Sequence, residues 1–310
     1  MKMKNKVDIT VGICVKNSEK TPIRETIESI LNQTFPRERI EIIVVDDGCT
    51  DRTIPIIVDL LSKAKVSYYI YSTGGKGRSA ARQMVVDNAH GKFVVWVDDD
   101  TVLLNSFFQE QFDIINKNPL IGAVQGKIGY WPTGSLVAKL EYLSMSRDYE
   151  FKFLKRDPKT LGTGSNMFRL SAIKKAGGFD RKIGRRAGED TDITRRIKTL
   201  GYRLSLSQAE SKHIFGLKNW KDLWSKYVYY GYGMHYLHRK HKNLISFMSR
   251  SLPVRFAEAI VCSLVAFKKT REIVSFLLPL FAVLKSAAWW FGFIKAHIKD
   301  RDKFLKRNYD

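Results

Sequence analysis

The stretch FVVWVDDD, residues Phe93–Asp100, decides the fold class of this 310-residue chain. Its unbroken apolar run is typical of a strand that is buried on both faces of a parallel sheet. Two earlier stretches have the same form, ITVGICV (Ile9–Val15), which leads into Lys16-Asn17, and IEIIVVDD (Ile40–Asp47). Polar side chains therefore follow each of these expected strands, and sheets of this kind bind ligands at the carboxyl ends of their strands.

Helical and strand-like segments alternate around these runs. Helices are expected over Pro22–Leu31, Ile54–Ser62 and Ser79–Ala89, with a further strand over Val66–Ser72. This order predicts an α/β fold with a mainly parallel sheet and helices on both faces. The pattern loosens after Asp100, where the expected elements are a helix near Phe107–Asn116, a strand near Ile121–Ile128, a loop at Leu161–Arg169, a helix over about Asp190–Leu200 and a last strand over about Tyr202–Ser207.

The acidic triplet Asp98-Asp99-Asp100 indicates a cation site. In an extended segment Asp98 and Asp100 point to the same side, where their carboxylates repel each other unless a cation lies between them. Hard oxygen ligands suit Mg²⁺ or Mn²⁺, which would bridge a diphosphate. Asp99 faces the other way and would reach a sugar or ribose hydroxyl. A solvated acidic turn is the alternative.

Two further segments predict contacts with a nucleotide. Asp46 and Asp47 precede a turn at Gly48, and one of these carboxylates would accept the imide N–H of a uracil or the N–H edge of a guanine. Lys76 and Arg78 follow a pair of glycines and would meet phosphate charge. An ordinary turn and an ordinary helix start are the alternatives for these two segments.

Acidic residues also gather where the helix near Asp190 is expected to begin. Glu189, Asp190 and Asp192 follow Gly188. Acids in a first turn complement the helix dipole, which accounts for any one of them. Three of them in a chain of net charge +22 indicate a further role, and a general base that deprotonates a hydroxyl is the natural one.

As a set, these segments resemble a known family. From about Ile9 to His213 the chain carries, in order, VVDDGCTD, KGRSAAR, VVWVDDD, LGTGSNMFR, GGFD and GEDTDITRRIKTLGYR. The set is similar to that of the family 2 glycosyltransferases. The resemblance implies a GT-A fold, a Rossmann-like nucleotide-sugar domain, over residues 1–235. It also implies an inverting, metal-dependent hexosyltransferase that moves a sugar from a UDP- or GDP-sugar to a lipid-linked or glycan acceptor.

The resemblance assigns roles to individual residues. Asp190, paired with Glu189, would be the base that activates the acceptor. Asp98 and Asp100 match the metal-binding DxD pair, for Mn²⁺ or Mg²⁺, and His213 would be a third ligand, the alternative being an ordinary core or surface histidine. With the nucleotide contacts above, the expected donor-binding set is Val15, Asn17, Glu19, Asp46, Asp47, Lys76, Arg78, Asp99, Gly164 and Asn166.

The chain departs from the family pattern at three places. Lys16 stands where the first strand of relatives usually ends in a Pro-Thr-Tyr-Asn type sequence, and Cys49 replaces the usual Ser. The stretch Trp220–Tyr227 lacks the Gln-x-x-Arg-Trp motif of processive polysaccharide synthases. This last departure argues against processive polymerisation.

Residues 236–310 are expected to form a helical region associated with a membrane. Residues 201–310 hold 20 Lys and Arg against 7 Asp and Glu, a balance that suits the anionic cytoplasmic face of the cell membrane. Leu252–Phe267 and Ile273–Ile294 are apolar, and Lys285 in the second run opposes insertion by about 2.5–3.5 kcal/mol. One or two membrane spans, a monotopic pair of amphipathic helices and a soluble helical subdomain are the three interpretations.

Other classes of protein are less well supported. A sugar nucleotidyltransferase needs a glycine-rich loop after the first strand, and Val15–Lys20 contains no glycine. A non-catalytic scaffold and a basic nucleic-acid-binding protein remain alternatives, although paired acids would repel a phosphate backbone, so no nucleic acid is expected. The cysteines Cys14, Cys49 and Cys262 lie far apart, which argues against a disulfide framework or a zinc site.

Overall fold

The computed structural model describes residues 7–129, 134–154, 158–214, 216–241 and 251–309. Its contacts divide the chain into two compact units that interleave along the sequence. The first unit comprises residues 1–131, 152–185 and 189–214, and the second comprises residues 132–151, 186–188 and 215–310. The division expected after residue 235 falls inside the helix α8 (Trp220–Lys240).

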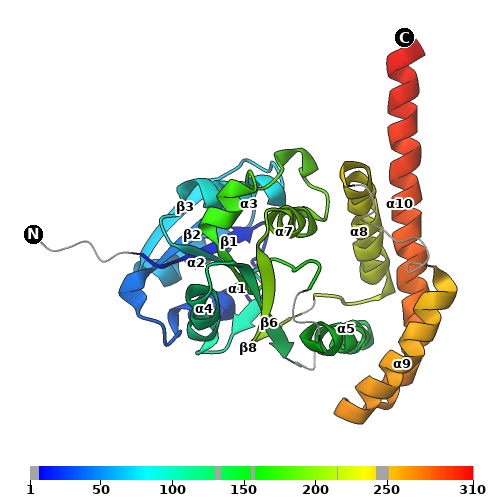
Figure 1. Ribbon diagram of the computed structural model, residues 1–310, viewed down its shortest axis with the longest axis horizontal. Helices are drawn as coiled ribbons and strands as arrows, with labels where there is room; N and C mark the ends of the chain where they lie inside the picture. Colours follow the sequence, from blue (N-terminus) through cyan, green and yellow to red (C-terminus); the bar gives the residue numbers. More distant parts are fainter. Residues whose placement is uncertain (1–6, 130–133, 155–157, 215, 242–250, 310) are drawn as a thin grey trace, which may run out of the picture. The chain divides into compact units, whose positions relative to one another are not determined.

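The first unit is built on an eight-stranded sheet of order β3-β2-β1-β4-β7-β6-β8-β5 (Figure 1). The strands are β1 (Ile9–Val15), β2 (Ile40–Asp46), β3 (Ser67–Ser72), β4 (Phe93–Trp96), β5 (Thr101–Leu103), β6 (Ile121–Gly129), β7 (Asn166–Arg169) and β8 (Arg203–His213). Strand β1 pairs in parallel with both β2 and β4, so that Ile9 lies opposite Ile40 on one side and Phe93 on the other. The predicted α/β fold with a mainly parallel sheet is confirmed.

Helices cover both faces of this sheet (Figure 1). They are α1 (Ile23–Leu31), α2 (Thr53–Ser62), α3 (Arg78–Asn88), α4 (Phe107–Lys117), α6 (Leu170–Lys175) and α7 (Glu189–Thr199), with short 3₁₀ turns η1 (Arg37–Arg39) and η2 (Arg181–Ile183). One core cluster joins the sheet to α1, α2 and α4, and the other joins it to α3, α6 and α7. A Cβ at Gly12 would lie 2.8 Å from Val85 and 2.9 Å from Trp96, so this glycine lets α3 pack closely on β1.

The sheet differs from the sequence prediction at its antiparallel part. The expected loop Leu161–Arg169 contains β7, which pairs antiparallel with β4 and β6. Strand β8 continues to His213 rather than stopping at Ser207, because its last residues pair with β5. Strands of three or four residues carry too little periodicity to be recognised in the sequence. Whether they form depends on the strands with which they pair.

The second unit is helical. Its elements are α5 (Leu136–Leu154), α8, α9 (Leu252–Thr270), the 3₁₀ turn η4 (Ile273–Leu277) and α10 (Leu278–Tyr309). Helices α9 and α10 lie in the region that the sequence predicts to be helical. Helices α8 and α10 approach closely at two glycines, since a Cβ at Gly231 would collide with the Trp289 carbonyl and one at Gly292 with the Val228 carbonyl. Within the described residues, Ile273–Asp300 is the one helical segment long and apolar enough to cross a membrane, and an 18-residue window within it has a mean hydropathy of 1.7.

Candidate active site

The carboxyl ends of β1 and β2 bring the first predicted cluster together. Thr50 donates its backbone N–H to the Asn17 Oδ1 at 2.8 Å, and Arg52 donates its own to the Glu19 Oε2 at 3.1 Å. Asn17 has a φ of 53°, a left-handed conformation that Asn tolerates better than most residues. Val15, at the end of β1, is buried. These side chains hold the loop after β1 against the loop after β2.

The two neighbouring aspartates of the second strand differ in their surroundings. Asp46 Oδ1 accepts the backbone N–H groups of Gly48 and Cys49, at 2.9 and 2.7 Å. Asp47 is buried, and its Oδ1 accepts hydrogen bonds from Thr73 at 2.5 Å and from the Gly77 N–H at 2.8 Å. Asp46 is half-buried, so it is the carboxylate of the pair that solvent or a ligand reaches more easily.

The acidic triplet lies in a turn, so the expectation of an extended segment is wrong. Strand β4 ends at Trp96, and the Thr101 N–H donates to the Asp98 carbonyl at 3.1 Å. A turn sends successive side chains to different partners, and each aspartate here meets a different group. Asp98 Oδ1 lies 3.3 Å from Arg82 Nη2, whereas Asp100 Oδ1 lies 3.3 Å from His213 Nδ1.

Asp99, the middle residue, is engaged by the β1–α1 loop. Its carboxylate accepts a hydrogen bond from the Ser18 hydroxyl, and its carbonyl accepts one from Thr21 at 3.0 Å. Burial raises the pKa of the Asp99 carboxyl, and the Ser18 hydrogen bond opposes that rise. The structure thus gives Asp99 a partner within the protein, where the sequence predicts a contact with a sugar or ribose hydroxyl.

Arg82, on α3, is a residue that the sequence reasoning missed. Its guanidinium is buried, donates to the Glu189 carboxylate, and also lies near Asp98. It lies 5.9 Å from the centre of the Trp96 ring. The sequence contains a sign of this role, because Arg82 lies on the same face of α3 as the apolar Val85 and Val86. A buried arginine on an apolar helix face needs a buried carboxylate partner.

The two cations that are predicted to meet phosphate charge lie at the start of α3, the helix that carries Arg82. Lys76 is in the loop before this helix, and Arg78 is its first residue. Lys76 is exposed, and the Arg78 side chain is 52% exposed with its Nη1 3.8 Å from Glu189 Oε1.

Burial raises the pKa of Asp190, the Glu189 charge raises it further, and Arg82 opposes both. Glu189 and Asp190 therefore share one electrostatic cluster with Arg82.

The loop before β7 lies beside both Asp98 and Asp190. A Cβ at Gly164 would lie 2.9 Å from Asp98 Oδ2, and one at Gly162 would lie 3.8 Å from Asp190 Oδ2. Asn166 is buried and holds this loop in place, because its Nδ2 donates to the Gly162 carbonyl at 2.7 Å. The two glycines bring Asp98 and Asp190 to one loop, as the predicted site requires.

The predicted metal ligands meet only in part. His213 Nδ1 lies 3.2 Å from the Thr101 hydroxyl and also contacts Asp100, as described above. In the part of the chain that the structure describes, no three His, Cys, Asp or Glu side chains are gathered closely enough to hold a metal ion. An imidazole and a carboxylate are suitable donors for Mn²⁺, but Asp98 is drawn toward Arg82. Asp100 and His213 offer a carboxylate and an imidazole to a metal, and their ligation, like that of Asp98, stays a prediction.

A comparison with protein families decides which family the chain belongs to. The model of "Glycosyl transferase family 2" matches residues 10–177, more than half of the chain. The chain belongs to glycosyltransferase family 2. The resemblance that the sequence motifs indicate is thus confirmed, and with it the assignment of the chain to a family of transferases.

Relatives of this family 2 glycosyltransferase include the probable glycosyltransferase YdaM of Bacillus subtilis. The two are 26% identical over 246 residues, which cover 76% of this chain and 57% of YdaM. The chain spans about three fifths of the length of the first curated relatives it matches.

Two solved structures are similar in fold. The mannosyltransferase PcManGT of Pyrobaculum calidifontis, in complex with GDP-Man and Mn²⁺, is 16% identical with a TM-score of 0.62, covering 93% of this chain and 86% of that one. TarS 1–349 of Staphylococcus aureus, in complex with UDP, is 15% identical with a TM-score of 0.52, covering 91% and 89%. These likenesses confirm the GT-A fold.

Proposed function

We propose that this chain transfers a hexosyl group from a UDP- or GDP-sugar to an acceptor hydroxyl with inversion at the anomeric carbon. One observation carries the proposal: Arg82 joins Glu189 to Asp98, and the Gly162–Gly164 loop runs beside both Asp98 and Asp190. The predicted base and the predicted donor-side acid therefore belong to one cluster. The UDP and GDP-Man complexes of the similar structures support a nucleoside diphosphate donor.

Asp190 is the general base in this proposal. Its carboxylate takes the proton of the acceptor hydroxyl while the hydroxyl oxygen attacks the anomeric carbon. The new glycosidic bond forms as the bond from that carbon to the diphosphate oxygen breaks, and a single displacement inverts the centre. A pKa raised by burial brings the carboxyl nearer to the operating pH, where a general base is most effective.

The leaving nucleoside diphosphate needs positive charge beside it. Lys76 and Arg78 are exposed at the start of α3 and would supply part of that charge. Asp100 and His213, with Asp98 as a third ligand, would hold Mn²⁺ or Mg²⁺. When bound, the metal would neutralise charge that develops on the diphosphate. Asp46 would accept a hydrogen bond from an N–H group of the nucleobase of the donor.

We also propose that the second unit attaches the enzyme to the cytoplasmic face of the membrane, where its acceptor would be lipid-linked or a glycan. Large apolar side chains of α9 and η4 are exposed, including Ile260, Leu264, Ile273 and Phe276. Arg271, which is also exposed, lies between the two elements. An apolar surface edged by basic residues suits an anionic bilayer.

The test of the function uses the full chain purified in mild detergent. UDP-, GDP- and dTDP-sugars are screened with Mn²⁺ for release of the nucleoside diphosphate, alongside Asp98→Asn and Asp190→Asn. We expect release with one donor that is lost on chelation of the metal and in both variants. If no donor gives release and none changes the thermal unfolding in the presence of metal, the catalytic proposal fails and a scaffold role replaces it.

A further inference from the structure

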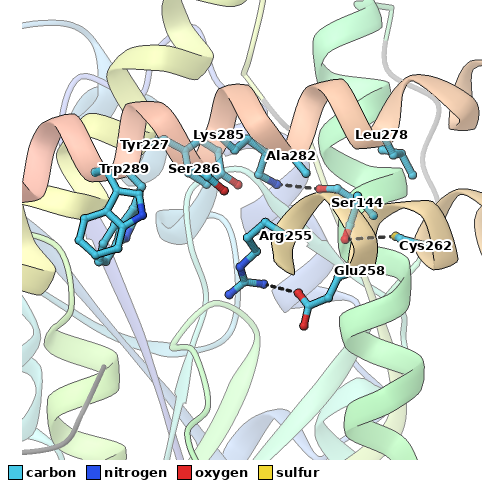
Figure 2. A pocket seen from close by; sticks show the side chains of 12 residues that line it. Ser144, Tyr227, Arg255, Glu258, Cys262, Leu278, Ala282, Lys285, Ser286 and Trp289 are labelled. Carbon is cyan, nitrogen blue, oxygen red and sulfur yellow. Dashed lines mark hydrogen bonds and ion pairs between the residues drawn. The ribbon is translucent and has the colours of Figure 1, made fainter. Parts of the chain in front are cut away.

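The second unit contains a cavity of about 250 Å³ that lies between α5, α8, α9 and α10 (Figure 2). Its walls combine cationic side chains, Arg255 and Lys285, with aromatic ones, Tyr227, Trp289 and Trp290. Pockets for drug-sized ligands measure roughly 300–1,000 Å³, so this cavity suits a smaller group. None of the residues assigned to sugar transfer lines it.

Lys285 is anchored in the cavity wall with hydrogen-bonding capacity to spare. Its Nζ donates to Glu141 Oε2 at 2.9 Å. It also donates to Ser144 Oγ at 2.8 Å (Figure 2). The ammonium also lies 4.7 Å from the centre of the Tyr227 ring. A lysine has three N–H donors, so one is left by these two bonds. The side chain is only 16% exposed, so its position is well fixed.

Arg255 contributes a second cation from α9. Its Nη1 donates to Glu258 Oε2 at 2.9 Å, one turn further along the same helix (Figure 2). A guanidinium has five donors in a planar fork that matches a phosphate or a carboxylate, so this bond uses only part of it. Lys285 and Arg255 reach the same cavity from different helices, α10 and α9. Each cation is paired with a carboxylate, and Glu258 also lines the cavity, so the donors that remain on Lys285 and Arg255 are what suits an anion.

Large apolar side chains are exposed on the same helices. Phe256, Ile260 and Leu264 are exposed on α9, and Leu280 is exposed on α10 at 68%. A soluble metabolite would make no contact with these apolar side chains, whereas the acyl chains of a lipid would lie along them. Tryptophans that line the cavity suit the boundary between a headgroup and its chains.

We propose that this cavity binds the phosphate of an anionic membrane lipid, with Arg255 and Lys285 as its direct contacts. The headgroup occupies the cavity, and the acyl chains leave it along α9 and α10. This proposal rests on the membrane attachment proposed above and not on sugar transfer. It also gives a role to Lys285, a lysine in the middle of an apolar run, beyond its pairing with Glu141.

The test is calorimetric titration of the full chain with soluble probes. The probes are dihexanoylphosphatidylglycerol, dihexanoylphosphatidylcholine and glycerol phosphate, each below any micelle-forming concentration. We expect the anionic lipid to bind most tightly, because the choline lipid carries a compensating charge and glycerol phosphate lacks acyl chains. Arg255→Gln should weaken binding of the anionic lipid about tenfold, the effect of one charge-assisted hydrogen bond.

Matched variants separate the cavity from general surface charge. Lys268→Gln removes the same charge from an exposed position of α9 outside the cavity and should leave the affinity unchanged. Ala282→Leu fills the cavity without changing charge and should abolish binding. Equal effects of Arg255→Gln and Lys268→Gln would overturn the proposal, as would binding of glycerol phosphate as tight as that of the lipid. Nucleoside diphosphate release by the wild type is measured separately, so a failure of sugar transfer is recognised independently.

Discussion

Arg82 holds two acidic residues that the sequence places about 90 positions apart, Asp98 and Glu189. Glu189 is 3% exposed, so loss of the arginine leaves a buried carboxylate without its main partner. We expect Arg82→Met to lower the free energy of unfolding by about 3–5 kcal/mol. Thermal unfolding of the full chain measures this loss.

A double variant separates stability from activity at this position. Arg82→Met with Glu189→Gln removes the buried charge together with its partner, so it should regain most of the lost unfolding temperature. Nucleoside diphosphate release should stay low, because Asp98 still lacks its contact. If the double variant is no more stable than Arg82→Met alone, Arg82 does not act through Glu189.

Asp190 gives a prediction about pH. Burial and the Glu189 charge raise the pKa of Asp190. The acid limb of the pH–rate profile should therefore lie at a higher pH than the ordinary pKa of an aspartate, which is about 3.9. Below that limb the carboxyl is protonated and accepts no proton, so the rate falls as the pH falls. Asp190→Asn should reduce turnover about 10²- to 10⁴-fold and leave folding intact, since the amide has the shape of the neutral acid.

The control for Asp190 is Asp87→Asn, an exposed acid on α3 that pairs with Arg181. It should change neither the rate nor the position of the acid limb. An unaltered profile in Asp190→Asn would show that another group titrates and that the base lies elsewhere.

At the scale of elements, the crossing of α8 and α10 depends on glycine. A Cβ at Gly292 would collide with the Val228 carbonyl, which as backbone cannot move aside. Gly292→Ala should therefore destabilise the second unit by about 1–3 kcal/mol, the usual cost of overpacking. Tryptophan fluorescence during denaturant unfolding follows this unit, which contains Trp220, Trp224, Trp289 and Trp290.

The matched control for that crossing is Gly216→Ala, in the same unit. A Cβ at Gly216 would meet no heavy atom within 4 Å, so this substitution should be close to neutral. Equal effects of the two substitutions would mean that the helices adjust and that the close approach is not required.

How far the sequence predicts an element depends on how much of its structure is local. Strands β1 and β2 have apolar runs buried on both faces, and the prediction of each ends within one residue of the structure. Helix α5 was missed, because its apolar residues form no single stripe and its Glu141 is buried against lysines from α8 and α10. Strand β7 is four residues long and depends on β4 and β6, which are distant in sequence.

The same distinction holds for the site. Motifs at strand ends predict that acids gather at one edge of the sheet, and the structure joins two of them, Asp98 and Glu189, through Arg82. The partner of each acid was not predictable, since the turn at Asp98–Asp100 sends the side chains apart to Arg82, Ser18 and His213.

At the scale of the whole molecule, Lys285 determines how the apolar run after Ile273 should be interpreted. A lysine within such a run opposes insertion into a bilayer, and here its ammonium pairs with Glu141, a residue of α5 that is 2% exposed. Lys226 of α8 contacts the same carboxylate at 2.9 Å. The run is therefore tied to other helices of its unit through charge, which argues against a plain span and agrees with the proposed attachment at a membrane surface.

This cluster predicts how the second unit responds to acid. Burial raises the pKa of Glu141, but Lys285 and Lys226 outweigh it and lower the pKa from 4.5 to about 2. A carboxyl whose pKa is depressed by folding stabilises the fold above its unfolded pKa and loses that contribution as the pH falls through its folded pKa. Stability monitored by tryptophan fluorescence should therefore fall between about pH 4.5 and 2, by about 3 kcal/mol from this group.

Glu141→Gln tests whether that acid sensitivity belongs to this carboxyl. The variant should be less stable at neutral pH, because both lysines lose their shared carboxylate, and its stability should change less between pH 4.5 and 2. Glu258→Gln is the control, since its ion pair with Arg255 is about one third exposed and is worth about 1 kcal/mol or less. An acid response in Glu141→Gln as steep as in the wild type would mean that the helices are not tied together by this charge. The apolar run could then insert into a bilayer at the cost of Lys285 alone.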